Sequence, residues 1–334
     1  MKLLKRKPAS EKVVDLLINN FNNSSIMLER NGELIVKYRE ETLLPLASIV
    51  KIIIASEFID QVSRGELDKD EEVGLDIIDR YYIPHSDGGA HAMWKKTLTK
   101  TPTLMNICQG MIKFSSNANS EYLLQRLGVQ NVNNKLKSFN IKSHDFIYPF
   151  SSAGLIPGFL IKKEKLSVRK AIDKLNQISE EEYINLSMEI HKKIGADQEK
   201  KFINTYNIFR ASALRIQEIQ SNKFIRGRLV DYVCVFKELL KNKHHKELFS
   251  GILRKESPYK YVAYKGGSTI NIINSLMYLE DKEDNNYLLG VFINNTGRKK
   301  SNLSLMEFNK KIIEDITYRN DVLKNLESIW LNCK

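Results

Sequence analysis

Cysteine is scarce in this chain, and long apolar runs are missing. The 334 residues include three widely separated cysteines, Cys108, Cys234 and Cys333. Their spacing matches neither a disulfide framework nor a metal-binding motif, so reduced structural thiols are expected. No stretch approaches the roughly 20 apolar residues of a membrane span, and the sequence predicts no membrane partner.

The first residues also lack the pattern of a secretory signal. Charges at Glu11, Lys12 and Asp15 interrupt the early apolar residues, and no small-residue cleavage site follows. The sequence therefore predicts a cytoplasmic protein.

Acidic residues are outnumbered by basic ones, which gives a formal net charge of +12. The basic clusters at residues 2–7, 162–165 and 298–300 are short, and no aromatic side chains alternate with them. A solvated basic surface is favoured over nucleic-acid binding, and no nucleic-acid partner is predicted. A preference for anionic substrates stays open.

Segments typical of strands lie towards both ends of the chain. Residues 25–30 and 33–38 flank Asn31-Gly32, a strong hairpin signal. Further strands are expected at residues 259–265, 274–280 and 287–294.

Between these segments the pattern is mostly helical. Helices are predicted at 11–21, from 48 onwards, at 104–113, 119–127, 130–139, 228–241 and 303–316, and a loop at 148–158. This order predicts an α/β fold of the α+β type: an antiparallel sheet from both termini, flanked by helices, with an inserted all-helical subdomain. The sheet subdomain is assigned to residues 1–60 and 227–334 and the helical subdomain to 61–226, with an extra helical insertion at about 155–226.

The first chemical motif is Ser48-Ile-Val-Lys51 at the start of a helix. A spacing of three places both side chains on one helical face, so the Lys51 amine can reach the Ser48 hydroxyl. A serine hydroxyl needs such a base to act as a nucleophile. The motif is common by chance, and an ordinary helix start is the alternative.

Two further motifs strengthen the assignment. Phe114-Ser115-Ser116-Asn117 precedes a helix, and Tyr264-Lys265-Gly266-Gly267-Ser268 ends a strand. The order Ser-x-x-Lys, Ser-x-Asn, Lys-x-Gly resembles the class A β-lactamases and penicillin-binding proteins. The resemblance covers about residues 23–150 and 227–319.

The resemblance implies a role for each matching residue. Ser48 attacks a carbonyl carbon, Lys51 accepts its proton, Ser115 relays the proton to the leaving group, and Lys265 adds positive charge. The substrate-binding residues would be Asn117, Gly267, Ser268 and, on a loop expected at the rim of the cleft, Tyr82 and His85.

The chain departs from the family at three positions. The deacylating glutamate of class A enzymes should fall near Phe150, where no carboxylate occurs. Ser116 replaces the usual aspartate of the second motif, and Gly266 the usual hydroxyl residue of the third. A fast hydrolytic mechanism is therefore in doubt, and the insertion is either a lid or a solvated embellishment.

These patterns predict a serine acyl hydrolase or acyltransferase acting on an amide, ester, lactone or β-lactam, a small-molecule or peptide-like acyl substrate. No cofactor and no metal are predicted, since His85, Asp87 and His91 lack a paired ligand pattern. The alternatives are a true class A-like β-lactamase with unusual deacylation, and a non-catalytic ligand-binding protein on the same fold. The sequence leaves the oligomeric state open.

Overall fold

The computed structural model describes residues 8–208, 213–251, 257–297 and 305–332. Cys333, the basic clusters at 2–7 and 298–300, and the predicted helix start at 303 lie outside these described residues. The chain divides into two compact units. We call Met1–Ile49, Arg226–Glu238 and Ser250–Lys334 the sheet unit, and Val50–Ile225 and Leu239–Phe249 the helical unit.

The sheet unit contains a five-stranded antiparallel sheet in the order β2-β1-β7-β6-β5, so the predicted fold class is confirmed. Asn31 and Gly32 both have positive φ (53° and 83°), as a two-residue hairpin turn of the favoured twist requires. The strands are β1 (Ser24–Arg30), β2 (Glu33–Tyr38), β5 (Tyr259–Ser268), β6 (Ile272–Asp281) and β7 (Asn286–Asn294).

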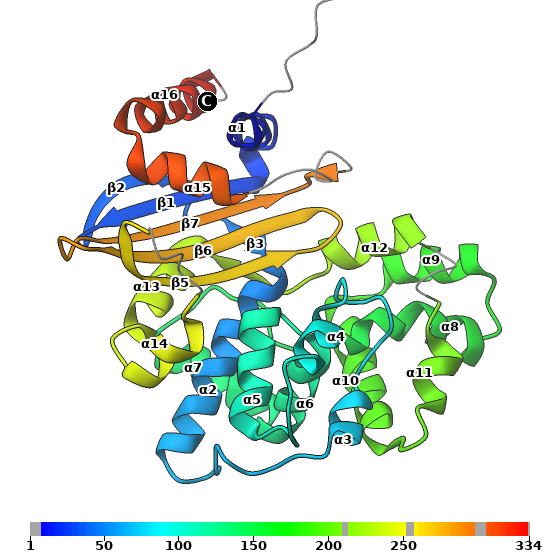
Figure 1. The fold of residues 1–334 in the computed structure, drawn as a ribbon. Helices are drawn as coiled ribbons and strands as arrows, with labels where there is room; N and C mark the ends of the chain where they lie inside the picture. The colour runs from blue at the N-terminus through cyan, green and yellow to red at the C-terminus, as the bar shows by residue number, and fades with distance from the viewer. Residues whose placement is uncertain (1–7, 209–212, 252–256, 298–304, 333–334) are drawn as a thin grey trace, which may run out of the picture. The chain divides into compact units, whose positions relative to one another are not determined.

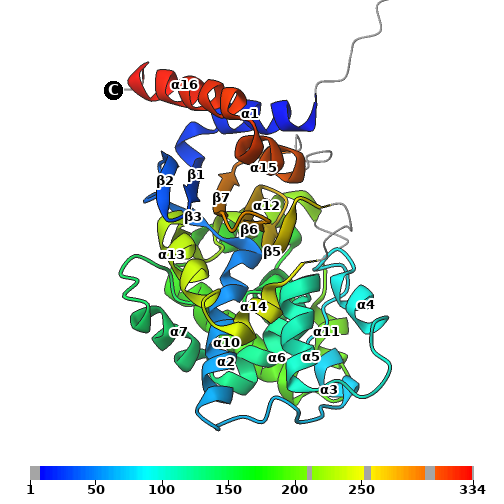
Figure 2. The same cartoon turned by 60° about the vertical axis from the view of Figure 1, so that its left-hand side comes forward.

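Three helices cover one face of this sheet: α1 (Ala9–Asn19), α15 (Leu305–Glu314) and α16 (Ile316–Asn332) (Figure 1, Figure 2). Leu17, Ile26, Leu289 and Phe308 are fully buried in the core between them. The sequence pattern predicts one helix that ends at residue 316, whereas the chain forms two. The Arg319 guanidinium donates to the carbonyl oxygens that end α15, those of Ile312 (2.8 Å) and Ile313 (2.6 Å), and so stabilises the break.

The sheet unit also contains short elements outside the main sheet. Two short strands, β3 (Leu43–Pro45) and β4 (Arg226–Arg228), pair outside the main sheet. They are shorter than the patterns that predict strands. The unit also contains η1 (Phe21–Asn23), most of η2 (Ala47–Val50) and most of α13 (Leu229–Leu239).

Helix α2 (Lys51–Ser63) is the central helix of the helical unit. Every residue from Lys51 to Ile59 is buried, and α6, α7 and α14 pack around them. A helix that is apolar on all sides is stable only when it is surrounded in this way. The other helices are α3 (Leu75–Asp79), α4 (Ala90–Lys95), α5 (Leu104–Gln109), η3 (Gly110–Phe114), α6 (Asn117–Leu127), α7 (Val129–Ser138), η4 (Ser152–Leu155), α8 (Ile156–Lys163), α9 (Val168–Gln177), α10 (Glu180–Ala196), α11 (Lys201–Tyr206), α12 (Ala213–Asn222) and α14 (Lys243–Phe249).

The predicted loop at 148–158 is wrong at its end, where η4 and then α8 form. Pro157 lies in the first turn of α8, where its missing N–H costs nothing. Gly158 lies against the carbonyl group of Tyr206, so this glycine marks a close helix contact. Among the described residues, no helix is both long and apolar enough to cross a bilayer.

Candidate active site

Ser48 lies in η2, directly after a strained residue. Ala47 is buried and has a φ of 47°, a left-handed backbone that alanine adopts at a cost on the order of 1 kcal/mol. The Ser48 side chain is partly exposed. The bend therefore presents the serine at the end of the segment that leads into α2.

Asn274 of β6 fixes the approach to this bend. Its buried amide donates to the carbonyl oxygens of Pro45 (2.9 Å) and Leu46 (3.1 Å), and its Oδ1 accepts from the backbone N–H of Ile293 (3.1 Å). Sequence reasoning missed Asn274, because a single asparagine in a strand carries no signal for a partner more than two hundred residues away.

Gly267 brings the third motif against the same bend. A Cβ atom at this position would lie 2.8 Å from the carbonyl oxygen of Leu46 and 2.9 Å from the backbone nitrogen of Ser48. Real Cβ atoms do not make such contacts with backbone, so β5 can pack here only with glycine. Ser268 follows as the exposed last residue of β5. The predicted residues Ser48, Gly267 and Ser268 thus belong to one neighbourhood.

Lys265 is buried on β5, with 2% of its surface exposed. Its Nζ donates to the carbonyl oxygen of Gly266 (2.7 Å). Burial disfavours the charged form and lowers the pKa of Lys265 to about 7. This amine is therefore close to its titration point at neutral pH.

Lys51 and the second motif meet within the helical unit. Lys51 is fully buried, and its Nζ donates to the Ser115 carbonyl oxygen (2.6 Å), the Ser115 Oγ (3.3 Å) and the Asn117 Oδ1 (2.9 Å). These acceptors match the three donors of an ammonium group. The Asn117 amide donates to the carbonyl oxygen of Ser86 (3.1 Å), which ties the motif to the preceding loop.

The backbone at the second motif is irregular. The π-helix η3 ends at Ser115, which has a left-handed φ of 68°, and Ser116 then caps α6 by accepting from the Asn119 N–H (3.3 Å). π-helical turns and strained residues are frequent at functional sites. The residue with this unusual backbone, Ser115, is also the first serine of the second motif.

Phe150 occupies the position where the resemblance expects a catalytic glutamate. Its ring centre lies 5.7 Å from the Lys51 Nζ, and the ring packs against Phe224 at 5.5 Å. A buried carboxylate from α6 binds the residues that follow Phe150. Glu121 accepts from the Ser151 N–H (2.8 Å), the Ser152 hydroxyl (2.5 Å) and His191 Nδ1 (3.0 Å).

The two loop residues predicted to bind substrate, Tyr82 and His85, have different surroundings. Tyr82 stacks on the His91 ring (4.9 Å between centres), whereas His85 is exposed and has a φ of 69°. The Asp87 carboxylate accepts from the N–H groups of Gly89 (3.1 Å) and His91 (3.0 Å), an ordinary turn and helix-start contact. Among the described residues, no hydrogen bond joins His85 to the second motif.

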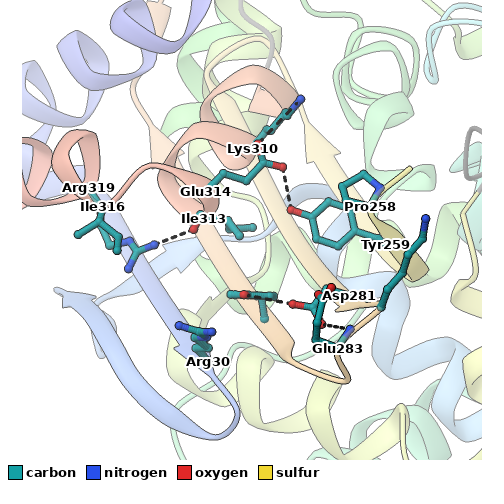
Figure 3. A pocket seen from close by; sticks show the side chains of 12 residues that line it. Arg30, Pro258, Tyr259, Asp281, Glu283, Lys310, Ile313, Glu314, Ile316 and Arg319 are labelled. Atoms are coloured by element: carbon teal, nitrogen blue, oxygen red, sulfur yellow. Dashed lines mark hydrogen bonds and ion pairs between the residues drawn. The ribbon is translucent and has the colours of Figure 1, made fainter. Parts of the chain in front are cut away.

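A cavity of about 740 Å³ lies elsewhere in the sheet unit (Figure 3). Tyr259 at its wall donates to Glu314 (2.8 Å). None of the three motifs contributes to its described lining, which consists of Arg30, Pro258, Tyr259, Asp281, Lys282, Glu283, Tyr287, Lys310, Ile313, Glu314, Ile316 and Arg319.

Comparison with known proteins gives one family and one fold. Residues 8–192 match the beta-lactamase enzyme family. None of the curated proteins compared with the chain matches its sequence.

Solved structures with a similar fold include beta-lactamases and a penicillin-binding protein. A beta-lactamase from Chitinophaga pinensis has a TM-score of 0.55 at 12% identity, covering 98% of this chain and 100% of that one. One from Sphaerobacter thermophilus has a TM-score of 0.52 at 13% identity, covering 98% of both chains. PBP-A has a TM-score of 0.51 at 10% identity, covering 87% of this chain and 88% of that one. At these identities the comparison concerns the fold.

Proposed function

The chain belongs to the beta-lactamase enzyme family, and on this premise we propose that it is a serine acyl hydrolase or acyltransferase that forms an acyl-enzyme on Ser48. The observation that carries the proposal is the set of hydrogen bonds from the Lys51 Nζ to Ser115 and Asn117. These bonds hold a buried amine beside a second hydroxyl, the arrangement needed to move a proton.

The spacing of Ser48 and Lys51 supports their pairing. The helix η2 ends at Val50 and α2 begins at Lys51, so the two residues lie three positions apart in continuous helical backbone. In such backbone, side chains at this spacing share one face. Lys51 must first lose one of the protons that it donates to Ser115 and Asn117. In its neutral form it is then the base that activates Ser48.

The acylation step follows from these roles. The Ser48 Oγ forms a bond to the substrate carbonyl carbon and transfers its proton to Lys51. The proton passes through the Ser115 hydroxyl to the leaving group, whose bond to carbon breaks. The backbone N–H groups of Ser48 and Ser268 stabilise the oxyanion, and Asn117 holds a substrate amide.

Lys265 and Phe150 indicate the substrate and the fate of the acyl-enzyme. A buried amine with a pKa of about 7 gains a proton when an anionic group binds beside it, which favours substrates with a carboxylate. Phe150 offers no group that can activate water. We therefore expect acylation of Ser48 to be faster than hydrolysis of the adduct.

A burst assay with a chromogenic ester and a chromogenic cephalosporin tests the proposal, with Ser48→Ala as the matched control. Turnover of the ester, with a slowly released cephalosporin adduct that maps to Ser48, is the expected result. Rapid cephalosporin turnover indicates a true β-lactamase. No reaction with either compound, or equal reaction in Ser48→Ala, overturns the mechanism and favours a binding protein.

A further inference from the structure

Asp79 and His91 lie beside the second motif, and we propose that they form a positioning pair that holds this motif through Ser116. The proposal rests on the proposed function, because the acceptors for Lys51 belong to the residues on either side of Ser116. Neither Asp79 nor His91 belongs to the three motifs.

The contacts form a continuous chain within the helical unit. The Nε2 of His91 lies 2.7 Å from the Asp79 Oδ1, and its Nδ1 lies 3.0 Å from the Ser116 Oγ. Tyr82 stacks on the His91 ring from one neighbouring segment, and Trp94 packs against it with 5.5 Å between ring centres. His91 is 1% exposed, so solvent does not compete for either nitrogen.

The charge of Asp79 sets the orientation of the ring. Burial by itself raises the pKa of Asp79, but hydrogen bonds from His91 and from Lys95 (2.7 Å) outweigh it and lower the pKa to about 2. Asp79 is thus a carboxylate at neutral pH and accepts from the Nε2–H of His91. This contact turns the Nδ1 atom towards Ser116, as an acidic partner orients histidine in hydrolase triads.

Ser116 transmits this constraint to the motif. Its hydroxyl carries one proton, which it can donate to the His91 Nδ1 or to the Asn119 Oδ1 (2.9 Å), and its carbonyl oxygen accepts from the Ser120 hydroxyl (2.8 Å). The side chains of Ser116, Asn119 and Ser120 are fully buried at the start of α6. A shift of Ser116 would therefore move its chain neighbours Ser115 and Asn117, which hold the Lys51 amine.

The pair also accounts for the uncharged residue in the second motif. The family resemblance has an aspartate where this chain has Ser116. Here a carboxylate is provided from α3 and reaches Ser116 through the His91 ring. The second motif is thus still linked to a carboxylate, although this carboxylate, Asp79, lies 37 residues before Ser116 in the sequence (79 to 116).

Three variants test the pair. His91→Leu removes both hydrogen bonds, His91→Asn keeps an amide able to reach Ser116, and His245→Leu is the matched control. His245 is a buried histidine of the same unit whose ring nitrogens form no hydrogen bond among the described residues. We expect His91→Leu to lower the acylation rate about 10- to 100-fold with KM changed less than about threefold, since small misplacements cost this much. His91→Asn should recover most of the loss, and His245→Leu should leave the rate unchanged.

A readout independent of activity separates this inference from the proposed function. Hydrogen–deuterium exchange of the amides of residues 115–120 should be faster in His91→Leu and unchanged in His245→Leu. If the wild-type protein forms no acyl-enzyme, the proposed function fails. The hydrogen–deuterium exchange rates alone then decide whether Asp79 and His91 hold the second motif. Unchanged exchange in His91→Leu, or equal effects in His245→Leu, overturns the inference. So does a His91→Leu acylation rate within twofold of wild type.

Discussion

Gly267 packs directly on the backbone of Ser48, because a Cβ atom at position 267 would lie 2.9 Å from the Ser48 nitrogen. The third motif thereby contacts the segment that carries the proposed nucleophile. With Asn274, which binds the carbonyl groups of Pro45 and Leu46, it fixes the bend before α2 from two strands.

We predict that Gly267→Ala impairs both stability and acylation. The new methyl group would meet backbone atoms that cannot move as a flexible side chain can, which costs about 1–3 kcal/mol of unfolding free energy. Acylation should fall at least about tenfold, because the Ser48 N–H would be displaced. Thermal unfolding and the burst assay measure the two effects. Gly154→Ala is the control, since a Cβ there meets nothing within 4 Å. Normal acylation in Gly267→Ala would argue against the role of this contact.

Lys265→Met should stabilise the protein at neutral and acidic pH. The pKa of Lys265 is about 7 in the folded chain, below the ordinary value of 10.5. Between these values the unfolded chain binds more protons, so the unfolding free energy of the wild type rises with pH. Below about pH 7 the folded chain must bury Lys265 in its charged form. This lowers the unfolding free energy by its full amount, on the order of a few kcal/mol.

Denaturant unfolding at pH 6, 8 and 10 measures this dependence. The advantage of Lys265→Met over wild type should be largest at pH 6 and shrink towards pH 10. A constant difference across this range would show that Lys265 does not titrate as described.

Lys51→Arg should abolish acylation as fully as Lys51→Ala does. A guanidinium retains its charge but cannot release a proton at neutral pH, so it cannot serve as the base. Each variant should lose on the order of a thousandfold in acylation rate. Labelling with a fluorophosphonate or a tagged penicillin, followed by mass mapping, gives the rate and the site. Near-normal labelling of Ser48 in Lys51→Arg would assign the base to another group.

Phe150→Glu should shorten the lifetime of a penicillin adduct. The ring centre lies 5.7 Å from the Lys51 Nζ, so a carboxylate at this position would lie beside the proposed base and could activate water. Phe150→Leu is the control, because it removes the ring without adding a base. Intact-mass spectrometry over time should show a persistent adduct in wild type and in Phe150→Leu. It should show at least tenfold faster loss of the adduct in Phe150→Glu. Steady wild-type turnover without an adduct would contradict the expectation.

Local patterns predicted most of the fold. The Asn31-Gly32 turn and the three C-terminal strands follow from turn chemistry and alternation, and the structure confirms them. The sequence patterns did not predict helix α16 or strands β3 and β4. Helix α16 depends on the Arg319 contacts, and β3 and β4 are too short to show a periodicity. The subdomain boundaries expected at residues 60 and 226 stay predictions.

The motifs predict candidate reactive residues, but they do not predict the residues that hold these candidates in place. Ser48, Lys51, Ser115 and Lys265 carry a recognisable spacing, and their catalytic roles remain predictions. Contacts between distant segments involve Asn274, Asp79, His91 and Glu121. Polar residues of this kind have no sequence pattern of their own. Ser10, which precedes the helix predicted at 11–21, lies inside α1 and donates to Glu307 (2.8 Å).

Glu121 binds the loop beside Phe150 with both carboxylate oxygens, so these oxygens are occupied by hydrogen bonds from the protein itself. On the proposed mechanism, such a protein would capture a reactive acyl compound and release it slowly. Its effect on such a compound would then be stoichiometric: each protein molecule would remove one molecule of the compound, so the amount of protein would limit the amount removed.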